Sequence, residues 1–183
     1  MKHMTKKAPW IQRAVLLILA LILALGACPV SAEDEAEVPL PDFSLTDQYG
    51  RTWTKEDLQG RAVFLNFWAT WCYWCVYEMP DIETLYHEYG ENEDAVLVLG
   101  VASPGDQDTA DEAGVADFLK EHGITYPVLM DTEGQLFRAL PMEGYPTTFA
   151  VKSDGMILGM VTGAISLEDM RRVVEMTLNG IVE

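Results

Sequence analysis

Basic residues are scarce in this chain of 183 residues, and they are unevenly placed. There are 12 Lys and Arg against 29 Asp and Glu, for a formal net charge of −17. Four basic residues and no acidic residue precede position 33, so the remaining eight basic and 29 acidic residues give residues 33–183 a net charge of −21. So acidic a surface repels phosphate backbones, and we expect no nucleic-acid partner. The acidic surface favours solubility. A second interpretation is that its charge biases the choice of partner protein.

Histidine and cysteine are scarce as well, with three residues of each. Beyond residue 32 the histidines are His87 and His122, and neither belongs to a pair with the spacing of zinc ligands. A copper-delivery chaperone would need a histidine further along as a third ligand, and none follows His122. We therefore expect neither a metal site nor a cofactor.

A long uncharged apolar run occurs once, from Ala14 to Cys28. Basic residues precede it, as in a signal segment, and it is short for a membrane span, which needs about 20 residues. Residues 1–32 are therefore predicted to be a signal peptide or a membrane or lipid anchor. Cleavage after Ala32, lipidation of Cys28 in the lipobox-like sequence Leu25–Cys28, and an uncleaved anchor all remain open. Each of them puts the rest of the chain outside the cytoplasm.

The fate of this segment decides how many thiols the exported protein keeps. Cleavage removes Cys28 and lipidation consumes it, which leaves Cys72 and Cys75; only the uncleaved form keeps a third thiol. A disulfide between residues so close together closes almost no loop, so it is rarely a structural staple. The pair is therefore expected to have a chemical role.

The rest of the chain is predicted to form a short linker followed by one domain. Residues 33–41 are acidic and contain proline, as in a linker, and residues 42–183 hold the domain. A turn predicts an N-terminal β-hairpin over residues 42–54. Apolar runs and helical spacings predict the other elements: strands at 62–68, 96–101, 127–130, 147–151 and 156–161, and helices after Pro80, around 115–122 and after Ser166. This order predicts an α/β fold with a mixed central sheet flanked by helices.

The segment Trp68–Cys75 places a C-x-x-C pair between a predicted buried strand and a predicted helix. Cys72 would lie at the helix N-terminus, where unpaired N–H groups and the positive end of the dipole stabilise a thiolate. Cys75, one turn later, would point to the same side and could attack the mixed disulfide that Cys72 forms. The spacing therefore indicates thiol–disulfide exchange.

Three sequence blocks, Leu65–Pro80, Tyr126–Asp131 and Tyr145–Phe149, occur in the order seen in one known family. Together they resemble the extracytoplasmic thioredoxin-like reductases of the TlpA and ResA type, and the resemblance spans roughly residues 40 to 180. It implies a thioredoxin-like fold with an N-terminal β-hairpin and a central helical insertion. It also implies a thiol–disulfide oxidoreductase that needs no cofactor and is expected to be a monomer.

The resemblance also assigns roles to individual residues. Cys72 matches the nucleophile, Cys75 the resolving thiol, and Pro146 the cis-proline beside which the backbone pairs with a bound peptide. Glu78 matches an acidic residue that tunes the cysteines, because a carboxylate near thiols raises their pKa and can carry a proton to the resolving cysteine. The alternative for Glu78 is an exposed helix glutamate.

The residues expected around the substrate groove are Trp71, Tyr73, Trp74, Tyr145 and Thr147. The chain departs from the family here, because the family usually has proline at the position of Trp74. Residues between the cysteines adjust thiolate stability and so the reduction potential. The direction of electron flow, reductase or oxidase, therefore stays open.

The expected partners are exported proteins with disulfides, for example apocytochrome c or a repair enzyme. A reductase would take its electrons from a membrane thiol carrier of the CcdA type. A narrower resemblance, at Val101–Gly105 and Tyr145–Thr147, is to surface thioredoxin-like proteins that reduce methionine sulfoxide reductases; the alternative is a long loop over residues 103–114. Peroxidase chemistry is disfavoured, because Ala69 stands where a peroxidatic cysteine would have a threonine three residues before it.

Overall fold

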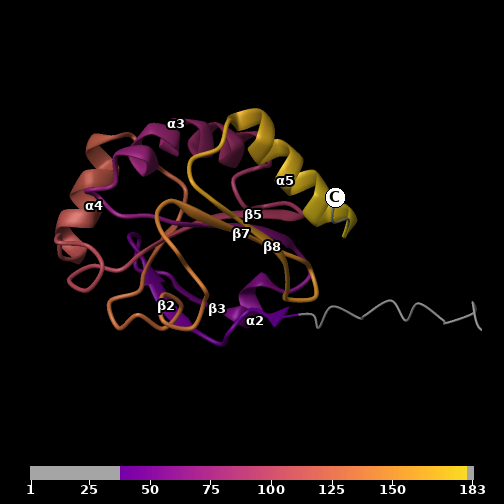
Figure 1. Ribbon diagram of the computed structural model, residues 1–183, viewed down its shortest axis with the longest axis horizontal. Helices are drawn as coiled ribbons and strands as arrows, with labels where there is room; N and C mark the ends of the chain where they lie inside the picture. Colours follow the sequence, from indigo (N-terminus) through magenta and orange to yellow (C-terminus); the bar gives the residue numbers. More distant parts are fainter. Residues whose placement is uncertain (1–37, 181–183) are drawn as a thin grey trace, which may run out of the picture. The chain divides into compact units, whose positions relative to one another are not determined.

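The computed structural model describes residues 38–180 (Figure 1). The predicted signal or anchor segment, residues 1–32, and Cys28 within it lie outside the described residues. In the part that is described, no helix combines the length and the apolar character needed to cross a membrane.

One mixed sheet forms the centre of the described domain, with the strand order β1-β8-β7-β4-β5-β6-β2-β3. β4 lies in the middle, parallel to β5 and antiparallel to β7, and β5 continues in parallel to β6. The bounds are β1 Val38–Pro39, β2 Ser44–Asp47, β3 Thr52–Thr54, β4 Ala62–Phe67, β5 Val96–Ala102, β6 Val128–Met130, β7 Thr147–Val151 and β8 Met156–Thr162.

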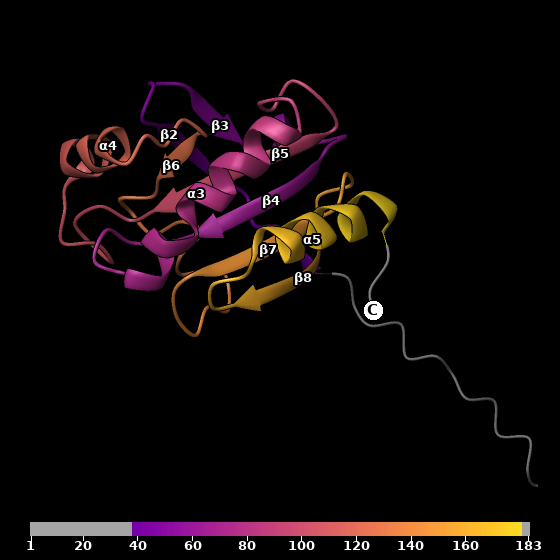
Figure 2. The same cartoon turned by 90° about the horizontal axis from the view of Figure 1, so that it is seen from above.

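Helices cover the sheet on both sides of its central strands. α3 (Tyr73–Glu88) packs against β5, and α5 (Leu167–Asn179) packs against β4 and β7 on the same face (Figure 2). α4 (Glu112–Glu121) joins β5 to β6, and the short α2 (Lys55–Leu58) lies on the side away from α3, α4 and α5 (Figure 1). This arrangement confirms the predicted α/β thioredoxin-like fold, including the N-terminal β-hairpin of β2 and β3 and the central helical insertion α4.

β4 shows how the alternation of a strand builds two cores. Its side chains point to opposite faces in turn, with period 2. Val63, Leu65 and Phe67 enter the apolar cluster on the α2 side, whereas Phe64 enters the cluster beneath α3 and α5. Asn66 faces the same way as Phe64 and is also buried, so the strand brings one polar side chain beneath α3.

The folded region begins before residue 42. Val38 and Pro39, which lie in the predicted linker, pair with Ile157 and Met156 at the start of β8. Leu40 is buried in the core on the α2 side. β1 has only two residues, and both side chains are exposed, so it lacks the alternation of apolar and polar residues that marks a strand. Its pairing with β8 therefore cannot be predicted from the sequence.

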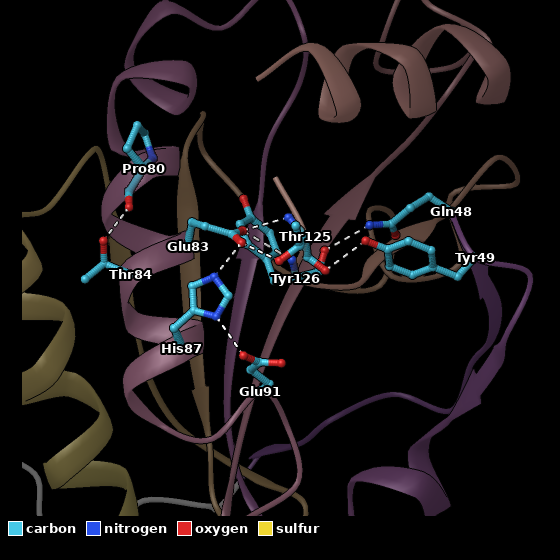
Figure 3. A network of polar contacts seen from close by, with 9 residues as sticks. All are labelled: Gln48, Tyr49, Pro80, Glu83, Thr84, His87, Glu91, Thr125 and Tyr126. Carbon is cyan, nitrogen blue, oxygen red and sulfur yellow. Dashed lines mark hydrogen bonds and ion pairs between the residues drawn. The ribbon is translucent and has the colours of Figure 1, made fainter. Parts of the chain in front are cut away.

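A polar network fastens the second half of α3 to the start of β6 (Figure 3). The Glu83 carboxylate accepts hydrogen bonds from the backbone N–H of Thr125 at 2.7 Å and of Tyr126 at 3.3 Å, and one from the Thr125 hydroxyl. It also lies 3.1 Å from His87 Nε2, whose ring reaches Glu91 through Nδ1 at 3.0 Å. The helix that begins at the C-x-x-C pair is thereby held in place near its other end.

Candidate active site

The C-x-x-C pair lies where β4 ends and α3 begins. Cys72 is the N-cap residue of α3, and the Cys75 backbone N–H donates to Cys72 Sγ at 3.2 Å. The two cysteines form a disulfide with their Cα atoms 5.3 Å apart. Cys72 is the more accessible, at 6% exposure against 1% for Cys75. In the reduced form, the helix N-terminus would stabilise a thiolate on Cys72.

Glu78 lies one turn after Cys75 and is buried, with 1% of its surface exposed. Its Oε1 accepts a hydrogen bond from Asn66 Nδ2 at 2.9 Å, and its Oε2 accepts one from the backbone N–H of Ile165 at 3.1 Å. Burial raises the pKa of Glu78 to about 7, against the lowering effect of these two hydrogen bonds. The carboxyl can therefore gain or lose a proton near neutral pH.

Pro146 follows a cis peptide bond with Tyr145. Its carbonyl accepts a hydrogen bond from the Gly163 N–H at 2.8 Å. The Tyr145 ring meets the Trp71 ring edge-on, with centroids 5.6 Å apart, so this segment reaches the loop that carries Cys72. Thr147 is buried in β7, where its hydroxyl donates to the Gly144 carbonyl at 2.8 Å, and it presents no exposed side chain.

An apolar surface surrounds the disulfide, and we call it the aromatic rim. Its members on the C-x-x-C loop and α3 are between 56% and 71% exposed, although their size would favour burial: Trp71, Tyr73, Trp74 and Tyr77. The Trp74 ring stands edge-on to both Tyr73 and Tyr77, at centroid distances of 5.2 and 5.7 Å. Exposed aromatic clusters of this kind mark surfaces where proteins or peptides bind.

The loop after β5 is fastened to the C-x-x-C loop by Asp108. This buried carboxylate accepts hydrogen bonds at 2.6 Å from both the backbone N–H and the hydroxyl of Thr70. The indole N–H of Trp71 donates to the Gln107 carbonyl at 3.0 Å. Both contacts act on the two residues just before Cys72, so the loop fixes the chain on the N-terminal side of the disulfide.

A sequence profile of the AhpC/TSA family matches residues 36–160, about two thirds of the chain. The chain belongs to the AhpC/TSA family. Within that family it resembles the thiol-disulfide oxidoreductase ResA of Geobacillus thermodenitrificans, with 32% identity over 178 residues that cover 94% of this chain and 98% of the relative. ResA of Bacillus subtilis is 30% identical, with 88% of each chain covered.

Solved structures agree with this placement in the AhpC/TSA family. The exposed lipoprotein thioredoxin Etrx1 of Streptococcus pneumoniae has a TM-score of 0.65 and 31% identity, over 73% of this chain and 98% of its own. A thiol:disulfide interchange protein of Chlorobium tepidum has a TM-score of 0.68 and 30% identity, over 79% and 98%. StoA of Bacillus subtilis, at 23% identity and a TM-score of 0.64, shares the fold. The protein is thus a ResA-like thiol–disulfide oxidoreductase.

The structure of this AhpC/TSA-family member brings most of the predicted site residues together. Cys72, Cys75 and Glu78 share the first turns of α3, and the segment at Tyr145 and Pro146 reaches them from the other side. Glu78 is not the exposed helix glutamate that the sequence left as an alternative. No group of three or more His, Cys, Asp or Glu is arranged to hold a metal ion within residues 38–180.

Three neighbours of the disulfide were not foreseen from the sequence. Asn66 is the single polar residue in the apolar run of β4, and this break in the run was the only feature of the sequence that could have pointed to it. Tyr77 has helical spacing from Trp74, which places both on one face of α3. Asp108 carried no local signal, because its partner Thr70 lies 38 residues away in the chain.

Proposed function

We propose that this oxidoreductase reduces disulfides in exported proteins, with Cys72 as the nucleophile and Cys75 as the resolving thiol. The observation that carries the proposal is the position of Cys72 at the N-cap of α3, where it is more accessible than Cys75. The Cys72 thiolate attacks one substrate sulfur, and the second substrate sulfur leaves as a thiolate. Cys75 then loses its proton and attacks Cys72 Sγ, which leaves the substrate as a dithiol and the enzyme as a disulfide.

In this proposal Glu78 handles the proton of the resolving step. Its pKa of about 7 lets it accept a proton from a neighbouring thiol and release it again near neutral pH. Its position one turn after Cys75, in a part of the core that includes Cys75 and Met79, supports the role. A negative charge at Glu78 would also hold the thiol pKa values up.

The substrate is proposed to bind across the aromatic rim, with its backbone beside Pro146. An extended peptide can pair with exposed backbone like an added strand, and the Tyr145 ring next to Pro146 packs edge-on against Trp71. Trp71, Tyr73 and Trp74 would then cover the substrate disulfide. Thr147 would support this segment from inside, through its hydrogen bond to Gly144.

The protein is proposed to act outside the cytoplasm, carried there by residues 1–32, either through cleavage after Ala32 or through anchoring at Cys28 or an uncleaved segment. The basic, then apolar, sequence of that segment supports export, and the pneumococcal relative is described as an exposed lipoprotein. Electrons would come from a membrane thiol carrier of the CcdA type. Apocytochrome c, or an exported methionine sulfoxide reductase, is the proposed substrate, and the reductase is proposed to work as a monomer.

The competing proposal on the same site is an oxidase that donates its disulfide to folding proteins. Trp74 is the observation behind this proposal, because it stands where the related family usually has proline. The residues between the cysteines set the relative stability of thiolate and disulfide, and so the reduction potential. A reduction potential near that of thioredoxin, about −270 mV, supports the reductase, whereas one near about −120 mV supports the oxidase.

Trapping of mixed disulfides tests the proposal directly. A Cys75→Ala variant cannot resolve the intermediate, so it should accumulate covalent complexes with exported proteins that a thiol reductant releases. A Cys72→Ala variant, which keeps the other cysteine, is the matched control and should trap none. Complexes formed equally by both variants, or by neither, would overturn the assignment of Cys72 as nucleophile.

A further inference from the structure

A cavity of about 440 Å³ opens beside the disulfide on the side of α5. Its walls are Trp74, Tyr77 and Asp81 of α3, Tyr145, and residues 163–166 between β8 and α5. The three α3 residues have spacings of three and four, so one helix face presents two aromatic rings followed by a carboxylate. The proline that the related family usually has at the position of Trp74 would provide no such ring.

The far wall of this cavity is held by hydrogen bonds that two of its backbone N–H groups donate. The Gly163 N–H donates to the Pro146 carbonyl at 2.8 Å, and the Ile165 N–H donates to Glu78 at 3.1 Å. Both bonds connect the wall to residues of the candidate active site. The cavity is therefore formed before any substrate binds.

The charge at the cavity is negative, and the carboxylate that carries it is in no close ion pair with the described side chains. The Asp81 side chain makes no hydrogen bond or ion pair with any residue from 38 to 180. Arg171 is the nearby cation. Its pKa is raised mainly by its hydrogen bonds to Glu88, with a smaller contribution from Asp81. Its guanidinium is held by Glu88 through two hydrogen bonds, at 2.8 and 2.5 Å, and so is not available to Asp81. Residues 33–183 as a whole carry a net charge of −21, so the surroundings also favour a cation.

We propose that this cavity is a specificity site for a lysine or arginine side chain that lies near the reacting cysteine of the substrate protein. Aromatic faces attract a cation through their quadrupole, and the apolar stem of lysine or arginine packs on the rings while its charged end reaches the carboxylate. Trp74 and Tyr77 supply the rings, and Asp81 supplies the charge. The inference rests on the proposed function and names its substrates as polypeptides with a cation beside the cysteine.

The test compares peptides that differ in one side chain. Each has a single cysteine activated as a mixed disulfide with 2-nitro-5-thiobenzoate, and carries arginine, lysine, norleucine or glutamate at one of the three positions on either side of it. The full-length chain carries Cys28→Ser, so that Cys72 and Cys75 are its only thiols. Release of thiobenzoate gives the second-order rate constant, and the same peptides with glutathione correct for intrinsic reactivity.

The expected result is a lysine-to-norleucine rate ratio on the order of fivefold at the best position, with arginine at least as fast and glutamate slowest. Asp81→Asn should lower this ratio markedly toward one, and Trp74→Leu and Tyr77→Leu should each reduce it. Glu93→Gln is the matched control, since it removes one exposed charge beyond the opposite end of α3 and should keep the ratio. All rates are taken at about 0.3 M salt, where charges more than a Debye length apart are largely screened.

Two results would overturn the inference while leaving the oxidoreductase intact. One is an equal rate for all peptides. The other is a preference for cations that is equally large in Asp81→Asn and in Glu93→Gln. Such a preference would come from the overall charge of the protein and not from Asp81. Failure of the protein to react with any peptide would instead count against the proposed function itself.

Discussion

Asn66 of β4 and Glu78 of α3 meet in the buried interior, where Asn66 Nδ2 donates to Glu78 Oε1 at 2.9 Å. The same amide donates to the Thr148 hydroxyl of β7 at 3.0 Å. The hydrogen bond from Ile165 adds the loop before α5. One buried carboxylate thus joins the central strand, the helix that carries the cysteines and the wall of the adjoining cavity.

Burial of Glu78 should make the stability of the oxidised protein fall with rising pH. The folded-state pKa of about 7 lies above the ordinary value of 4.5. The stability linked to its proton is therefore complete below about pH 4.5 and is lost as the pH rises through about 7, to an extent of about 3 kcal/mol. The free energy of unfolding, measured by denaturant titration from pH 4.5 to 8.5, should lose this slope in Glu78→Gln.

The matched control for that slope is Glu133→Gln, which removes an exposed carboxylate outside the site. It should leave the pH dependence as in the unmodified protein. A pH slope that survives in Glu78→Gln would mean that Glu78 already ionises at its ordinary pKa in the folded protein. The proton-carrying role would then have no basis.

Asp108 should contribute to stability because it is buried and accepts three hydrogen bonds. Asp108→Ala leaves the Thr70 N–H without its partner, so we expect a loss of about 3 kcal/mol in the free energy of unfolding. Thr70→Val removes only the hydroxyl bond and should cost about 1 kcal/mol. Equal losses in the two variants, measured by denaturant titration, would contradict the assignment of the larger part to the backbone N–H.

Gly100 of β5 lies against side chains that leave no room for a methyl group. A Cβ there would come within 2.9 Å of Val128 Cγ2 and 3.2 Å of Trp68 Nε1. We expect Gly100→Ala to lower the free energy of unfolding by about 1–3 kcal/mol through overpacking. Gly159→Ala, in β8 with nothing within 4 Å of the new atom, should have no such cost and gauges the effect of alanine alone. If both variants lost the same stability, close packing at Gly100 would be refuted.

His87 on α3 should titrate above its ordinary pKa. Its hydrogen bond to Glu91 is the largest cause of the raised pKa, with Glu83 contributing (Figure 3). The stabilising effect of the charged ring is then present below about pH 6.5 and disappears as the pH rises through the folded-state pKa. Titration by NMR should show a lower pKa for His87 in Glu91→Gln. An unchanged value would show that this contact does not hold the ring in solution.

The sequence was sufficient for the elements whose signal is local. The apolar run of β4, the helical spacing of α4 and the Ser166 cap of α5 each predicted their element, and the C-x-x-C pair predicted the chemistry. The pairing of Val38 and Pro39 with β8 and the contact of Asp108 with Thr70 join residues far apart in the chain. No local pattern encodes such contacts, so tertiary structure alone reveals them.

The environment of Glu78 shows the same limit at the level of one residue. Its spacing from Cys75 could be seen in the sequence, and it predicted nearness to the cysteines. Its buried carboxylate is hydrogen-bonded to Asn66 of β4 and to Ile165 of the loop before α5, and Asn66 is hydrogen-bonded in turn to Thr148 of β7. The pKa of about 7 is therefore a property of the fold rather than of the motif.

The central claim is that Cys72 and Cys75 act as one reversible redox pair. Equilibration in dithiothreitol and glutathione buffers of graded potential, followed by alkylation and peptide mapping, measures the state of the pair most directly. Peptide mapping separates Cys28 from Cys72 and Cys75. Cys72 and Cys75 should become alkylated together in a single two-electron transition with a midpoint near −270 mV, about that of thioredoxin. Independent alkylation of the two cysteines would contradict the redox pair, and a joint midpoint near about −120 mV would contradict its use as a reductase.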